Sequence, residues 1–310
     1  MNHPEVIGIA LAATVFFALS TALKHRSAST LAVADTHGTA WLGHFLAATL
    51  SHRWWLAAIA ADAVGLALQA FALQIGAVSV VQPVLVTALV FSLVFNHVAA
   101  RTRITVRELA WGALLAVAVG TFLVVSGATT ASIHSSAADR GAAAAVALLA
   151  VVLGGGCVLV ARRLPSGGRA ALLGVVVGSI YACTAVLLKA VTGVASRGGL
   201  SAVLTSWQLP VLIVAGATGM VLAQLAFRSG PLNASLPAMA TIDPLLSVVL
   251  GLIVYDEQLR SGLVPTLGEV ASLAALAVAA VGLSRISAGN EEAPADSEGS
   301  PPGANVTARS

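Results

Sequence analysis

Charged residues are scarce in this sequence, and the scarcity excludes an ordinary soluble protein. Asp, Glu, Lys and Arg make up 9% of the 310 residues, whereas hydrophobic residues make up 58%. A soluble domain carries about 25% charged residues, so this chain has too few polar groups to cover its surface in water. The net charge is only +3, and we expect no nucleic-acid partner.

Cysteine and catalytic motifs are also nearly absent. Cys157 and Cys183 both lie in apolar stretches and form no CxxC motif, so we interpret them as small core residues and not as a zinc site. The sequence holds no Walker motif and no HExxH motif, which excludes an ATPase and a zinc protease of those types. We therefore expect no cofactor, no resident metal and no enzymatic activity.

Long uncharged stretches are what the sequence does have. Residues 63–100, 141–161, 170–188 and 198–227 contain no Asp, Glu, Lys or Arg. A helix that crosses a bilayer needs ~20 mostly apolar residues, and its backbone groups must bond within the segment. The sequence thus predicts an all-α polytopic membrane helix bundle with the lipid bilayer as partner. Nine spans are expected, over residues 5–24, 53–74, 77–99, 106–127, 141–161, 169–190, 205–227, 232–255 and 265–285.

The distribution of basic residues predicts the orientation. Cytoplasmic loops collect Lys and Arg, and nine spans place 12 of the 16 on one side and 4 on the other. Residues 27–52 contain an apolar patch that is either an interfacial helix or a tenth span, and a tenth span lowers the ratio to 10 against 6. The charges favour nine spans in the plasma (inner) membrane, with the N-terminus outside and the C-terminus in the cytoplasm.

An internal repeat relates the two halves of the chain. FFALSTALK is similar to YACTAVLLK, and Glu108-Leu-Ala is similar to Glu269-Val-Ala. At a constant shift of 154 residues, Gly65 aligns with Gly219, Gly76 with Gly230 and Pro83 with Pro237. Each repeated span of the second half is the fifth span after its counterpart in the first half. Since successive spans cross the membrane in opposite directions and five is odd, the halves must have opposite orientations. Inverted repeats are typical of transporters that bind substrate near the bilayer midplane.

The repeat divides the chain into four parts. Residues 1–140 form the first membrane repeat, residues 141–162 the linking span and residues 163–287 the second, inverted repeat. Residues 288–310 have no apolar face to bury and are predicted to be a disordered cytoplasmic tail.

Two acids within predicted spans are the main candidates for a binding site. A charge at the centre of a membrane helix costs about 2.5–3.5 kcal/mol, so such residues are functional candidates by default. Asp62 shares a helix face with Gln69, and Asp243 shares one with Ser247. A carboxylate there would bind a coupling proton or a cation; alternatively, each acid is simply hydrogen-bonded within the bundle.

Other polar residues and prolines leave two interpretations open. Gln82 and Asn96 lie close to one face of the span 77–99 and either line a solute path or hold helices together. Pro83, Pro237 and Pro244 are candidate hinges at a cavity, or are prolines that the helices tolerate.

Charged residues at the ends of spans are expected to be structural. Lys24 and Lys189 end two spans, and snorkelling to the interface accounts for them. Glu108 opens a span, where a helix N-terminus favours an anion, and Glu269 has a similar position in the second half.

Several motifs resemble the drug/metabolite transporter superfamily (EamA-like). The YDEQL stretch, Tyr255 to Leu259, is similar to the helix end that recurs in that superfamily. The Trp54-Trp55 pair, the PVLVT stretch after Gln82 and the lysines that end two spans are closer to the NIPA-type magnesium transporter branch. The likeness covers about residues 5–286, but the glutamate that follows the Trp pair by ten residues in that branch is replaced here by Gly65.

These observations together predict a secondary transporter of a small solute, which works by alternating access between two inverted repeats. Coupling to a proton or cation through an intramembrane Asp is expected. The alternatives are a divalent-cation (magnesium) transporter and a non-transporting membrane scaffold or partner subunit. The sequence leaves open whether the chain acts as a homodimer.

Overall fold

The regular elements of the described residues are all α-helices, which confirms the all-α fold class. The computed structural model describes residues 4–31, 53–100, 103–127, 163–229 and 232–292. The helices are α1 (Pro4–Leu31), α3 (Arg53–Ile75), α4 (Val78–Leu85), α5 (Ala88–Ala100), α6 (Val106–Ser126), α8 (Ser166–Thr205), α9 (Gln208–Ser229), α10 (Leu232–Val254) and α11 (Leu263–Glu292).

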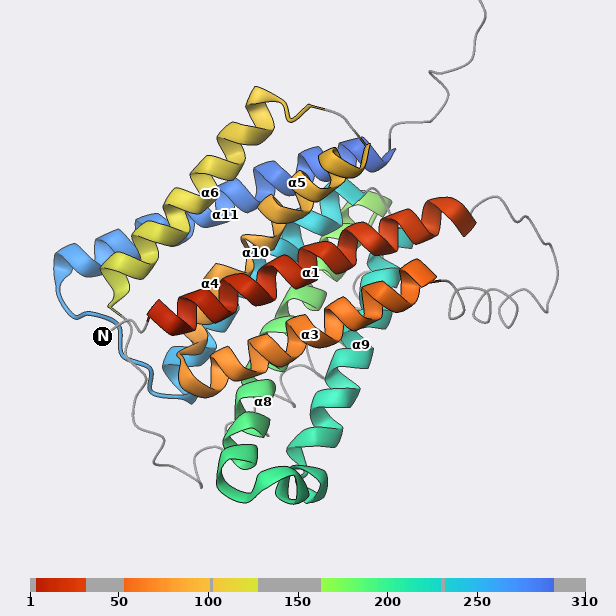
Figure 1. Cartoon of the computed structure of the whole chain (residues 1–310). Helices are drawn as coiled ribbons and strands as arrows, with labels where there is room; N and C mark the ends of the chain where they lie inside the picture. Colours follow the sequence, from red (N-terminus) through yellow and green to blue (C-terminus); the bar gives the residue numbers. More distant parts are fainter. Residues whose placement is uncertain (1–3, 32–52, 101–102, 128–162, 230–231, 293–310) are drawn as a thin grey trace, which may run out of the picture.

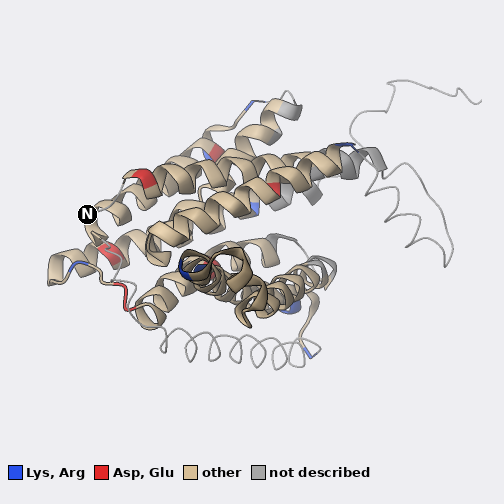
Figure 2. Cartoon of the chain, turned by 60° about the horizontal axis from the view of Figure 1, so that its bottom comes forward, with Lys and Arg blue, Asp and Glu red and all other residues tan. Residues whose placement is uncertain are grey.

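The chain is a multi-pass membrane protein. Seven stretches within the described helices are long and apolar enough to cross a bilayer: Pro4–Leu23, Arg53–Ile75, Val78–Phe95, Val106–Ser126, Ser166–Thr205, Ala234–Val254 and Leu263–Ile286. A shorter apolar stretch, Gln208–Ala223, lies in α9. Figure 2 shows that Lys, Arg, Asp and Glu occupy few positions on the described helices. Large apolar side chains such as Val124 and Ile253 are exposed, as expected for a surface in contact with lipid.

Each predicted span in the described residues overlaps helical segments, but the predicted span 77–99 consists of two helices, α4 and α5. The predicted span 141–161, the linking segment 141–162 and the boundary at residue 140 lie outside the described residues. Of the ambiguous residues 27–52, the first five continue α1 to Leu31, and the others are also outside the described ranges. At the other end of the chain, α11 runs past the predicted boundary at residue 287 to Glu292.

Local sequence signals explain where several helices end. The Thr105 hydroxyl accepts a hydrogen bond from the Glu108 amide at 3.3 Å, and the Glu108 carboxylate accepts one from the Thr105 amide at 2.7 Å. This reciprocal capping box begins α6. The helix stops at Gly127, whose φ of 48° lies in the left-handed region that glycine adopts readily. Gly199, with φ 66° and ψ −165°, is a non-helical residue that kinks α8, and α8 extends beyond the predicted span 169–190 at both ends.

Apart from the turn between α8 and α9, which lies at the bottom of the view, most helix ends lie at two opposite sides of the bundle (Figure 1). We call one side the α4-start end, because α4 begins there. Helices α3, α6 and α10 end at this side, and α11 also begins there. We call the opposite side the α10-start end, because α10 begins there. Helices α3, α6 and α8 also begin at this side, and α11 ends there. Helix α1 packs on α3, α8 packs on α9 and α10, and α10 also contacts α4 and α11. Helices α6 and α11 lie side by side and run in opposite directions.

The 154-residue shift found in the sequence also relates helix boundaries. Moved by 154, the range of α3 becomes 207–229, and α9 spans Gln208–Ser229. Val78 begins α4 and Leu232 begins α10, again 154 residues apart. The end of α3, the end of α9 and the starts of α4 and α10 are thus related by the same shift to within one residue.

The glycines of the aligned helices make equivalent close contacts. A Cβ added at Gly65 would lie 2.9 Å from the ring of Phe17, and one at Gly219 would lie 2.9 Å from the ring of Tyr181. The sequence alignment pairs Tyr181 with Phe16, so the contact is shifted by one residue along α1. In both halves, the absence of a side chain lets an aromatic ring pack directly on the neighbouring helix.

Candidate functional site

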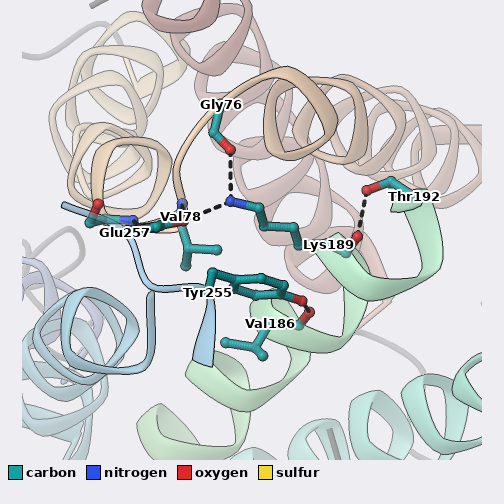
Figure 3. Close-up of polar contacts among 8 residues, drawn as sticks. Gly76, Val78, Val186, Lys189, Thr192, Tyr255 and Glu257 are labelled. Atoms are coloured by element: carbon teal, nitrogen blue, oxygen red, sulfur yellow. Dashed lines mark hydrogen bonds and ion pairs between the residues drawn. The ribbon is translucent and has the colours of Figure 1, made fainter. Parts of the chain in front are cut away.

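A buried carboxylate at the α4-start end bonds the start of α4. Glu257, in the loop between α10 and α11, accepts hydrogen bonds from the amides of Val78 and Ser79 (Figure 3). The distances are 2.6 Å to Oε1 and 2.9 Å to Oε2. The first amides of a helix have no partner within the helix and carry partial positive charge. Glu257 therefore caps a helix of the first half with a side chain of the second.

Lys189 of α8 completes this cluster. Its Nζ lies 2.6 Å from Glu257 Oε1, donates to the carbonyl of Gly76 at 3.0 Å and sits 4.7 Å from the ring centroid of Tyr255. The side chains of Lys189 and Glu257 are 14% and 1% exposed. The snorkelling predicted for Lys189 is wrong, because its ammonium is held inside the bundle by an anion, a carbonyl and an aromatic face.

The backbone of the 255–260 loop gives Glu257 its position. Asp256 has a φ of 47°, a left-handed conformation that Asp adopts more readily than most residues. The amides of Tyr255 and Glu257 both donate to the carbonyl of Gly251, at 3.1 and 3.3 Å. A Cβ at Gly251 would collide with Glu257 Oε2. Glycine at position 251 is thus needed for the carboxylate to reach α4.

The same loop contacts two further helices. The Tyr255 hydroxyl donates to the carbonyl of Val186 in α8 at 2.7 Å. The Arg260 amide donates to the carbonyl of Ser126, the last residue of α6, at 2.8 Å. The 255–260 loop therefore bonds α4, α6 and α8 to one another at the α4-start end of the bundle.

Of the predicted site residues, Asp243 and Ser247 are in direct contact. Ser247 Oγ donates to Asp243 Oδ1 at 3.3 Å, which confirms that they share a face of α10. That face lies against α8 at two glycines. A Cβ at Gly174 would lie 2.6 Å from the carbonyl oxygen of Ser235, and one at Gly178 would lie 3.2 Å from the amide nitrogen of Asp243. The small residues let the two backbones approach closely.

The other predicted polar residues lie on other helices. Asp62 and Gln69 are half-buried on α3, which packs on α1 and α8. Gln82 is buried on α4, and its Nε2 has no hydrogen-bond partner among the described residues. The side chain of Asn96 lies outside the described residues. The structure therefore does not join all six predicted residues into one site.

The predicted hinge prolines differ between the halves. Helix α4 ends at Leu85, two residues after Pro83, and α5 begins at Ala88. Helix α10, in contrast, contains both Pro237 and Pro244 within one continuous helix. The helix is thus interrupted shortly after Pro83, whereas it continues through the counterpart, Pro237.

A cavity of about 760 Å³ opens between α8, α10 and α11 near the α10-start end. Its walls are mainly apolar, and the hydroxyl of Thr241 has no partner among the described residues. The lining residues are Ala171, Val175, Ala234, Pro237, Ala238, Thr241, Ile242, Val281 and Arg285. Pro237 thus lines the cavity, whereas Asp243 is only next in sequence to the lining residue Ile242.

A second, smaller cavity of about 350 Å³ lies between α6 and α11. Val281 and Arg285 line both cavities, and Arg107 and Trp111 of α6 line the smaller one. Sequence reasoning did not select Arg285 or the Lys189–Glu257 pair as site residues. The repeated span-end lysine and the YDEQL motif were signals for the pair, but nothing in the sequence indicated the cavity.

The chain is similar to a known protein whose function is not assigned. Over 251 residues, the chain is 30% identical to an uncharacterized protein of Corynebacterium glutamicum. The alignment covers 81% of this chain and 84% of the relative. No protein-family model matches the chain, and no solved structure matches it significantly.

Proposed function

The chain belongs to the same family as this Corynebacterium glutamicum protein, and we propose that it is a secondary transporter that moves a small solute by alternating access. The contrast between the two ends of the bundle carries the proposal. The α4-start end is closed by the buried Lys189–Glu257 pair, whereas the α10-start end is hollowed by the 760 Å³ cavity. A carrier that is open to one side of the membrane has this asymmetry.

The proposal includes nine spans in two inverted repeats, as in the drug/metabolite transporter superfamily. The boundaries of α3 and α9 and the starts of α4 and α10, related by one shift, support it. The opposite directions of the neighbouring helices α6 and α11 also support it. Two similar halves that face opposite ways give two conformations of similar energy, one open to each side.

The proposed orientation places the cavity on the cytoplasmic side of the plasma membrane. Arg53, Arg107, Arg169 and Arg285 lie near the α10-start end, at the starts of α3, α6 and α8 and near the end of α11. Basic residues favour the cytoplasmic side. The N-terminus is then outside and the C-terminus inside, and the structure represents an inward-facing conformation.

Asp243 is the proposed coupling residue. It lies on the α8–α10 contact, one residue from the cavity wall, and its carboxylate accepts a hydrogen bond from Ser247. Binding of a proton or a cation there would change the charge at the contact between two helices that must move during transport. Coupling is accordingly a property of the α8–α10 contact and not of the α4-start end.

Cysteine accessibility tests alternating access without knowledge of the substrate. Cys157 and Cys183 are first replaced by Ala, and Ala171→Cys in the cavity and Ser79→Cys beside Glu257 are introduced separately. A membrane-impermeant maleimide is then applied to inside-out and right-side-out vesicles. The Ala171→Cys variant should react from the cytoplasmic side, and the Ser79→Cys variant should be protected.

The decisive comparison adds Glu257→Gln to each reporter. Loss of the ion pair should increase labelling at position 79 from outside and decrease labelling at position 171 from inside. A non-transporting scaffold predicts no such opposite changes, so labelling that changes at only one position, or at neither, contradicts the carrier. Flux assays in liposomes over a panel of solutes, with and without a pH gradient, then identify the substrate.

A further inference from the structure

We infer that the solute is an amphiphilic anion, whose acidic group binds Arg285 and whose apolar part occupies the 760 Å³ cavity. The inference rests on the proposed function, and it names the class of substrate. The shared chemistry is a phosphate or carboxylate group joined to an apolar body. Such a molecule reaches the cavity either as a free solute or as an anionic membrane lipid.

The charge of the cavity walls is the first observation. Arg285 lines both cavities and Arg107 lines the smaller one, and among the described residues no Asp or Glu lines either cavity. The remaining walls are mainly alanine, valine and isoleucine side chains. The guanidinium can bind an anion, and the apolar walls can contact an apolar group. A divalent cation, in contrast, would find few of the oxygen ligands that it requires.

The availability of Arg285 is the second observation. No hydrogen bond or ion pair of this side chain occurs within the described residues, and the residue is exposed. A guanidinium presents a planar fork of donors that matches a carboxylate or a phosphate in two parallel hydrogen bonds. The site therefore supplies a directional anion binder in addition to a positive charge.

The packing around Arg285 is the third observation. A Cβ at Gly282 would collide with the ring of Trp111, so the glycine lets the indole lie against α11 one turn before Arg285. Arg107 and Trp111 are four residues apart on α6 and share one face. Both arginines thus lie toward the α10-start end from the indole ring, and Arg285 also lines the larger cavity.

The volume fits a small molecule. Ligand sites in proteins have volumes of about 300–1,000 Å³ and are mostly apolar with a few placed polar groups. The larger cavity falls in this range, with Arg285 and Thr241 as its polar groups. The competing interpretation of Arg285 is a basic residue that only sets orientation, and Arg103 provides the control for it. Arg103 is exposed before α6 and lines neither cavity.

Tryptophan fluorescence of the full chain in phosphatidylcholine nanodiscs tests the inference. Both the chain and its Trp111→Phe variant are titrated with hexyl phosphate, hexanoate or hexyltrimethylammonium. The difference between their fluorescence intensities is the signal of Trp111. Saturable binding of the anions is expected. Arg285→Gln should weaken it about tenfold, the loss expected for one charge-assisted hydrogen bond. Arg285→Lys should weaken it less, and Arg103→Gln should leave it unchanged.

Nanodiscs that contain phosphatidylglycerol distinguish the two sources of the anion. If this lipid alone produces an Arg285-dependent change and hexyl phosphate adds none, the ligand is a lipid headgroup. If only the soluble anions produce the change, the ligand is a free solute. Either result supports the anionic class, provided that Arg285→Gln elutes from size-exclusion chromatography as the parent chain does.

Three results would overturn the inference: equal binding of the cation, equal weakening by Arg285→Gln and Arg103→Gln, or no binding of any probe. None of them affects the labelling at positions 79 and 171. Reciprocal labelling without anion binding would leave the carrier in place and remove only its substrate class. Anion binding without reciprocal labelling would instead indicate a binding protein that does not alternate.

Discussion

The two ends of the bundle use charge in opposite ways. At the α4-start end, Lys189 and Glu257 are buried against each other and against backbone groups. At the α10-start end, Arg285 has no ion pair within the described residues and lines two cavities. A charge that is fully bonded holds helices together, whereas a charge left beside a cavity is available to a ligand. The following substitutions separate these roles, from the largest expected effect on stability to the smallest.

Removal of the Glu257 carboxylate should have the largest effect. Glu257→Ala leaves the Lys189 ammonium buried without its anion and leaves two α4 amides unbonded. Breaking a buried pair in this way costs about 3–5 kcal/mol, so the thermal unfolding midpoint in detergent should fall strongly. Asp256→Asn is the matched control, because Asn keeps the left-handed conformation and loses one charge in the same loop. Equal shifts for both variants would show that the ion pair does not stabilise this end.

Widening the α8–α10 contact should have the next largest effect. In Gly174→Ala, the new Cβ meets the Ser235 carbonyl at 2.6 Å, and overpacking of this kind costs about 1–3 kcal/mol. At Gly216 of α9, a Cβ meets nothing within 4 Å. Gly216→Ala should therefore be neutral or slightly stabilising, since Ala favours a helix. Thermal unfolding followed by circular dichroism measures both, and destabilisation by both variants alike would contradict the close contact.

Loss of one hydroxyl should weaken the α4-start end moderately. Tyr255→Phe keeps the ring under Lys189 but removes the hydrogen bond to the Val186 carbonyl, at a cost of about 0.5–1.5 kcal/mol. Labelling of the Ser79→Cys reporter from outside should rise, but less than with Glu257→Gln. If labelling rises more than with Glu257→Gln, the tyrosine and not the ion pair closes this end.

Neutralisation of Asp243 should affect stability least and transport most. The Ser247–Asp243 hydrogen bond is long, 3.3 Å, so Asp243→Asn should change the free energy of unfolding by roughly 0.5 kcal/mol or less. Once a substrate is known, gradient-driven flux in proteoliposomes should be abolished, while binding to the cavity persists. Flux equal to that of the unchanged chain would exclude Asp243 from coupling.

The sequence predicted those parts of the fold that depend on local composition. The predicted span 53–74 and the helix Arg53–Ile75 nearly coincide, because the mainly apolar stretch is bounded by Arg53 and by Gly76. Ser247 is correctly placed beside Asp243, because helical periodicity alone decides which residues share a face. The 154-residue shift pairs Gly65 with Gly219, and both glycines make a close contact with an aromatic ring.

The sequence did not predict features that depend on tertiary contacts. Lys189 bonds residues 68 and 113 positions away in the chain, and no local pattern distinguishes a lysine that snorkels from one that pairs. Alanine and valine line most of the cavity. The same residue types are common in the packed helices, so composition does not distinguish a cavity wall from a packed contact. The kink in α8 at Gly199 depends on a φ of 66°, which is not evident from the residue type alone.

The break between α3 and α4 has a consequence for biogenesis. The Gly76 carbonyl and the Val78 and Ser79 amides obtain their partners from residues 189 and 257. Polar backbone groups that lack partners in lipid cost several kcal/mol each. While the ribosome is still synthesising the second half, the inserted first half must therefore hold these groups near water or in another arrangement. The first half reaches its final conformation only after the ribosome has completed the loop before α11.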